Sequence, residues 1–101
     1  MKTIHRYDFV PDDVVHIDMP KGARILSVEP SDRLAPVFGV ALWALVDTDQ
    51  SMEVRHLYVH GTGHPLTRPL ARFVGTVNHG RIVWHVFEPA PLVGADADGP
   101  E

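Results

Sequence analysis

Apolar and polar residues alternate in short runs along most of this chain. Val15, Ile17 and Met19 alternate with polar side chains, and Leu57 and Val59 do the same further on. A period of two is typical of β-strands that bury one face. No window carries the sustained 3.6-residue apolar stripe of an amphipathic helix. The pattern therefore predicts strands.

Proline and glycine divide the chain into about seven segments that are rich in β-branched and aromatic residues, which favour strands. The predicted strands cover residues 2–9, 14–19, 24–29, 37–46, 52–60, 73–77 and 81–87. The last two are predicted to form a hairpin through Asn78-His79-Gly80. Short strands joined by short turns indicate an all-β fold, a small antiparallel β-sandwich or barrel, and the choice between the two stays open.

Residues 37–46 are almost entirely apolar, so the alternation disappears there. That pattern fits a central strand covered on both faces or a short buried helix, and Gly39 and Val40 favour the strand. Trp43, and Trp84 in another apolar segment, are predicted to lie in the core.

Strict alternation also predicts which side chains share a face. Leu26 and Val28 are expected on one face of their strand and Ile25 on the other. Glu53 and Arg55 share the face of the apolar residues that follow them. A partly buried ion pair is therefore expected if that face is inward.

Composition is typical of a small globular domain. The chain has 101 residues, 45% of them hydrophobic, no cysteine, and a formal net charge of −4. Residues 1–88 are predicted to form a single β domain, and residues 89–101 a disordered acidic tail. A mildly acidic domain lacks the basic field that attracts phosphates, so nucleic-acid binding is not expected.

Two further features bear on location. The first residues carry no apolar signal-peptide core, and the longest apolar run, about twelve residues, is too short to cross a bilayer. The absence of cysteine excludes disulfides, thiolate metal sites and thiol nucleophiles. These features predict a cytoplasmic protein without membrane contact.

The most distinctive motif is Gly61-Thr62-Gly63-His64-Pro65. Two glycines around a hydroxyl would let backbone N–H groups approach an anion or nucleotide, so these five residues are a candidate ligand-binding loop. Their spacing matches neither the phosphate loop nor the dinucleotide fingerprint. A tight turn at the end of a strand, with glycine at positive φ, is the favoured alternative.

Histidines recur every four residues at His56, His60 and His64, which makes them candidate metal ligands. On a strand, His56 and His60 would share a face but lie roughly 13 Å apart, too far for one ion to bridge. A metal site would need other histidines to converge in space. Solvated or core-packed histidines are the favoured interpretation.

No catalytic residues are identified. Ser27, Ser31 and Ser51 lack the strand–turn–helix context of a nucleophile elbow, and the carboxylates fall in predicted turns or at strand ends. The sequence therefore predicts a protein that is not an enzyme and that needs no cofactor.

Several blocks occur in order along residues 2–88. Among them are Met19-Pro20-Lys21-Gly22-Ala23-Arg24-Ile25-Leu26-Ser27-Val28, Leu42-Trp43-Ala44-Leu45-Val46-Asp47, Gly61-Thr62-Gly63-His64-Pro65 and His85-Val86-Phe87-Glu88. As a set they resemble a family of small bacteriophage, prophage and actinobacterial proteins, a domain of unknown function. The resemblance implies a cytoplasmic, phage-encoded accessory protein, and it implies no activity, cofactor or catalytic residue.

These observations lead to one functional hypothesis and one alternative. The hypothesis is a non-enzymatic interaction module that binds a protein of the host through a strand edge or an exposed loop. A homodimer through paired edge strands is a related expectation. The alternative is a small-ligand or metal binder that uses the loop 61–65 and nearby histidines.

Overall fold

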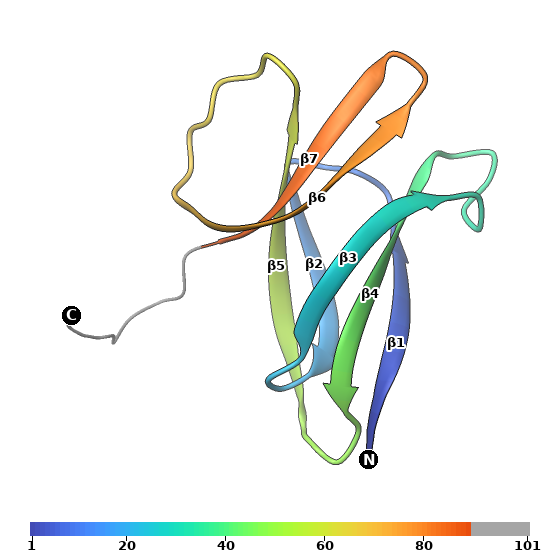
Figure 1. The fold of residues 1–101 in the computed structure, drawn as a ribbon, viewed down its shortest axis with the longest axis vertical. Helices are drawn as coiled ribbons and strands as arrows, with labels where there is room; N and C mark the ends of the chain where they lie inside the picture. Colours follow the sequence, from blue (N-terminus) through green and yellow to red (C-terminus); the bar gives the residue numbers. More distant parts are fainter. Residues whose placement is uncertain (90–101) are drawn as a thin grey trace.

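The computed structural model describes residues 1–89, apart from the side chain of Ala71. Every regular element in this part of the chain is a β-strand, so the all-β prediction is confirmed (Figure 1). The strands are β1 (Lys2–Phe9), β2 (Val14–Pro20), β3 (Arg24–Ser31), β4 (Gly39–Asp47), β5 (Met52–Gly61), β6 (Leu70–His79) and β7 (Ile82–Pro89). Since none of these elements is a helix, none is a long apolar helix of the kind that spans a membrane.

The strands form two antiparallel sheets. A three-stranded sheet has the order β1-β4-β3, and a four-stranded sheet has the order β2-β5-β7-β6. The arrangement is a sandwich, which settles the choice that the sequence left open. Sequence neighbours pair only at β3–β4 and at the predicted hairpin β6–β7, whereas the chain crosses between sheets at β1–β2, β2–β3 and β4–β5.

Strand β4 occupies the centre of the three-stranded sheet because its sequence is apolar on both faces. Val40, Ala41 and Leu42 are fully buried in succession, so the strand interpretation of this segment is confirmed. Trp43 was expected in the core but lies on the outer face, where the guanidinium of Arg6 stands 5.3 Å from its ring centroid. A cation over an indole face explains how this side chain is shielded without entering the core.

A β-bulge in β3 overturns the alternation expected there. The register against β4 shifts between Ile25 and Ser27, so Leu26 is an extra residue in the ladder. As a result Ile25 and Val28 both face the core, and Leu26 is exposed. Leu26 and Val28 therefore do not share a face.

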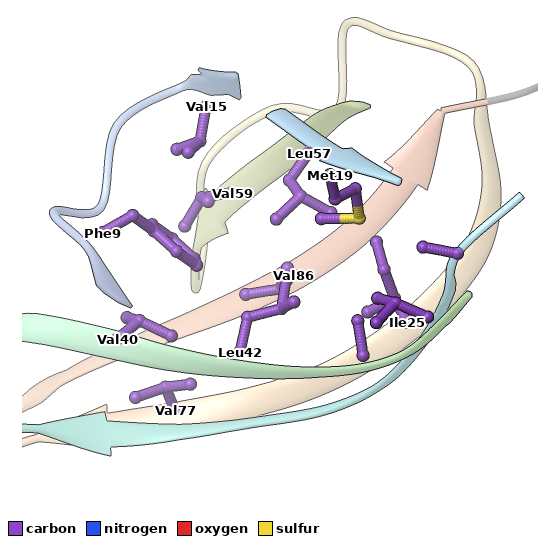
Figure 2. Close-up of a cluster of buried hydrophobic side chains, with 13 residues drawn as sticks. Phe9, Val15, Met19, Ile25, Val40, Leu42, Leu57, Val59, Val77 and Val86 are labelled. Atoms are coloured by element: carbon purple, nitrogen blue, oxygen red, sulfur yellow. The ribbon is translucent and has the colours of Figure 1, made fainter. Parts of the chain in front are cut away.

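The core lies between the two sheets (Figure 2). Every strand contributes to it, and the largest fully buried side chains are Met19, Ile25, Leu42, Leu57, Val40, Val46, Val77 and Val86. Burying one such side chain stabilises the fold by about 1.5–3 kcal/mol. Trp84 packs against this cluster while partly exposed, which agrees with its predicted place.

The edge strands β3 and β6, which belong to different sheets, pack closely against each other. Gly75 of β6 approaches β3 so closely that an added Cβ would lie 2.8 Å from Cγ2 of Val28. Arg72 Nη2 donates to the carbonyl oxygen of Ile25 at 2.8 Å. Glycine is needed at this position because no side chain fits between the strands.

A partly buried ionic cluster supports the same junction. Arg55 Nη2 donates to Glu88 Oε2 at 2.7 Å, Arg72 binds the other oxygen of that carboxylate, and Arg55 Nη1 donates to the carbonyl oxygen of Ala23. The expected partner of Arg55, Glu53, lies 3.8 Å away. The predicted ion pair is therefore confirmed, with Glu88 as the closer partner.

The last described residues belong to β7. Strand β7 ends at Pro89, one residue beyond the predicted boundary at 88. The acidic tail predicted over 89–101 otherwise lies outside the described residues.

Candidate functional site

The loop 61–65 begins where β5 ends. The backbone N–H of His64 donates to the carbonyl oxygen of Gly61 at 3.1 Å, which closes a tight turn, and Gly63 within it has φ of +87°. This is the turn geometry that the sequence favoured, with glycine in the left-handed region.

The same loop offers little to an anion. The N–H of Thr62 donates to the carbonyl oxygen of Val83 at 3.1 Å, and the N–H of His64 is used within the turn. A pocket of about 220 Å³ opens beside the loop, lined by Pro11, Asp12, Asp13, Val59, Gly61, His64 and Trp84. Two carboxylates in its lining repel an anion. Anion binding through residues 61–65 stays a prediction that this geometry does not favour.

The three candidate metal ligands point to different surroundings. His56 stacks on His16 with ring centroids 4.6 Å apart, His60 packs edge-on against Phe87, and His64 lies against Gly61. Within residues 1–89, no three His, Cys, Asp or Glu side chains come together in a way that would hold a metal ion. The structure therefore does not bring His56, His60 and His64 together.

A hydrogen-bonded group that sequence reasoning missed fixes this loop to the sheet. Thr62 Oγ1 lies 2.8 Å from His85 Nε2, and Thr76 Oγ1 lies 3.1 Å from His85 Nδ1. A neutral imidazole donates through one nitrogen and accepts through the other, so the two hydroxyls satisfy both. The three residues come from β6, β7 and the loop, and the pairing of the strands brings them together. No local sequence pattern indicates the group.

A second polar group joins β1 to the end of β3. Ser31 Oγ donates to Asp8 Oδ1 at 2.6 Å, and Arg6 donates to both the serine and the carboxylate. Burial by itself raises the pKa of Asp8, but these hydrogen bonds and the charges of Arg6 and Arg33 outweigh it and hold the pKa below its ordinary value. These hydrogen bonds join β1 to the end of β3.

The four strand edges of the sandwich differ in how they are protected. β3 and β6 face each other, and both contain register shifts. β2 pairs with its neighbour without a shift, but its last residue is Pro20, which has no N–H to offer a neighbour. β1 pairs with β4 without a shift from Lys2 to Phe9 and contains no proline. Bulges and prolines are the usual protection of an edge, so β1 stands out as regular and open.

One hydrogen bond shows which groups of β1 face outward. The N–H of Thr48 donates to the carbonyl oxygen of Met1 at 2.8 Å. In an antiparallel ladder the bonding residues alternate, so the odd residues of β1 bond to β4. The backbone groups of the even residues Lys2, Ile4, Arg6 and Asp8 point away from the sheet. Figure 1 shows β1 as the outermost strand of its sheet, with no strand beyond it.

An apolar surface continues from this edge. Ile4 of β1 lies opposite Leu45 of β4 on the outer face of the three-stranded sheet, and Ile4 is 55% exposed. Trp43 with its covering Arg6 follows next along the same face. A strand added at β1 would place alternate side chains against Ile4 and Arg6.

Comparison with known families identifies the chain's relatives. Residues 1–94 match the model of a family described as "Domain of unknown function (DUF7352)", and the chain belongs to this family. No curated protein and no solved structure matches the chain.

Proposed function

We propose that this member of a family of unknown function is a non-enzymatic interaction module that binds an extended segment of another protein along β1. The open, unshifted edge of β1 carries the proposal. Every second residue of β1 has backbone N–H and C=O groups that point outward and that described residues leave without a hydrogen bond. These residues are Lys2, Ile4, Arg6 and Asp8. Strand addition at an exposed edge is a common mode of peptide recognition.

The energetics fit a weak, reversible contact. An added antiparallel strand forms two hydrogen bonds at each outward residue, about eight in all. Each contributes about 0.5–1.5 kcal/mol net, and association costs about 4–15 kcal/mol. The backbone alone therefore gives weak binding. Contacts of the added strand with Ile4 and Leu45 supply the remaining affinity and the selectivity.

We assign the partner to the host cell and the module to the cytoplasm. This assignment rests on the resemblance of the sequence blocks to small phage and actinobacterial proteins, and the accessory role toward host proteins is part of the proposal. Strand addition supports such a role, because it needs no shared ancestry between the module and its target, only an extended segment with suitable side chains.

A proline scan of the edge tests the proposal. A photo-crosslinking amino acid at Ile4 would trap the partner in actinobacterial cells, and its binding to the purified protein would then be measured. Ile4→Pro removes an outward N–H together with the isoleucine side chain, and it leaves the β1–β4 ladder intact, since proline is tolerated at an edge. We expect at least ten-fold weaker binding for Ile4→Pro and a change of less than two-fold for Ile4→Val. A folded Ile4→Pro variant that binds the trapped partner normally would contradict the proposal.

A further inference from the structure

We propose that, in the absence of a partner, the β1 edge binds β1 of a second copy of this chain in antiparallel orientation, with the two-fold axis at His5. The inference concerns the occupant of the same edge, and it rests on the proposed function only in taking that edge as the interaction surface. Two-fold dimers, in which the same surface of both copies meets, are the commonest closed oligomers.

Hydrogen bonding limits the registers that β1 can adopt against itself. The outward groups belong to even residues, so even residues must face even residues for the ladder to form. The register with its axis at His5 engages all four outward residues. It places Lys2 opposite Asp8 of the second copy, and Ile4 opposite Arg6 of the second copy.

Charge then selects among the permitted registers. With the axis at His5, each Lys2 faces a carboxylate, and the pairing occurs twice by symmetry. With the axis at Ile4, Lys2 would face Arg6 of the second copy, and like charges directly opposite are destabilising. With the axis at Arg6, the two Arg6 side chains would face each other and Lys2 would have no partner strand. With the axis at Tyr7, Arg6 would face Asp8 of the second copy, but Lys2 would have no partner and Ile4 would face Val10, beyond the end of β1. The register with its axis at His5 is therefore the one that pairs all four outward residues without opposing like charges.

The carboxylate of Asp8 is 15% exposed, and its hydrogen bonds from described residues all go to one of its two oxygens. Its Oδ1 atom accepts from Ser31 and Arg6, while Oδ2 lies 3.9 Å from Arg33 Nη1, beyond a hydrogen bond. Lys2 is exposed at the start of the strand, and its long side chain can reach across to the opposing strand. The pair would thus add to the polar group around Asp8 without displacing it.

Such pairing also removes the one open edge of the three-stranded sheet. The opposite edge of that sheet, β3, is already packed against β6 through Val28 and Gly75. Joining β1 to β1 of a second copy would therefore produce one continuous sheet whose outer edges are both covered. An open regular edge promotes aggregation, so this closure protects the protein until a partner strand displaces the second copy.

Cysteine trapping tests the register directly, because the chain contains no cysteine of its own. The two His5 residues would form a non-hydrogen-bonded pair with Cα atoms about 4.5 Å apart, within the range for a disulfide. We expect His5→Cys to form a disulfide-linked dimer under mild oxidation and Thr3→Cys not to, because in this register Thr3 faces Tyr7 of the second copy. Cross-linking of Thr3→Cys, or of neither variant, would overturn the proposal.

Sedimentation equilibrium provides the second measurement. We expect a concentration-dependent dimer for the natural chain and at least ten-fold weaker dimerisation for Lys2→Asp, which places Asp opposite Asp8. A natural chain that is monomeric at all concentrations would overturn the inference, and if it still binds a partner at β1, the proposed function stands. A dimer that binds no partner strand would leave this inference intact and contradict the proposed function.

Discussion

Gly75 and Val28 lie so close that a methyl group on the glycine would stand 2.8 Å from Cγ2 of the valine. The contact joins β6 to β3, and it brings together the two edges that carry register shifts. Because these edges cover each other, β1 is left as the regular open edge of the three-stranded sheet. The contact thus decides which edge of that sheet is accessible.

Gly75→Ala is expected to lower the free energy of unfolding by about 1–3 kcal/mol, the usual cost of inserting a methyl group into a packed site. Urea unfolding at neutral pH measures the change. The double variant Gly75→Ala, Val28→Ala is the control, because removing the Cγ atoms makes room for the new methyl group. If the two substitutions add without coupling, the contact is not what constrains the junction.

Glu88→Gln is expected to destabilise the fold by about 1–3 kcal/mol, because it leaves Arg55 and Arg72 without their shared carboxylate. Glu88 is 17% exposed and Arg55 21% exposed, so solvent screens the pair only partly. Glu29→Gln is the matched control at an exposed position of β3, and it should change stability by less than about 0.5 kcal/mol. Equal effects of the two substitutions would show that the ionic cluster does not support the sandwich.

The stability of the protein should fall in acid partly through Asp8. Its pKa in the folded state lies below the ordinary carboxyl value of about 4, so its contribution is complete above that value and is lost as the pH falls through the folded pKa. Asp8→Asn should therefore be less stable than the natural chain at pH 7, and the difference should shrink at pH 3. Urea unfolding at the two pH values measures this. A difference that grows in acid would contradict the assignment.

Inorganic phosphate is expected not to raise the melting temperature of the protein. The N–H groups of Thr62 and His64 already have acceptors, and Asp12 and Asp13 stand at the neighbouring pocket. Thermal unfolding over a range of phosphate concentrations, with chloride at matched ionic strength as the control, measures the effect. A phosphate-specific rise that disappears in a folded Gly63→Ala variant would instead support the loop as an anion site.

The sequence predicted the strands well because their signals are local. Proline and glycine punctuation and the β-favouring composition between them marked all seven segments, and the apolar run of β4 indicated a strand covered on both faces. The bulge at Leu26 could not be predicted, because it is defined by how many residues of β3 face β4. Trp43 was misplaced for a related reason. Its shield is Arg6 on a strand more than thirty residues earlier, and only the β1–β4 pairing brings the two together.

The candidate site depended on information that the sequence does not hold locally. The loop 61–65 was recognised, and its favoured interpretation as a turn agrees with the hydrogen bond from His64 to Gly61. The group of Thr62, Thr76 and His85 went unnoticed because its members come from three separate segments. The open edge of β1 likewise follows from strand order, since any of the seven strands could have been an edge until the pairing was known.

Residue-resolved amide hydrogen exchange is the most direct measurement of whether β1 is an interaction edge. The N–H groups of Thr3, His5 and Tyr7 point to β4 and should exchange slowly under all conditions, whereas those of Ile4 and Arg6 should exchange rapidly in dilute protein. Raising the protein concentration or adding a partner strand should then protect Ile4 and Arg6. Rapid exchange of both amides under every condition, or protection already present in the dilute monomer, would contradict the account.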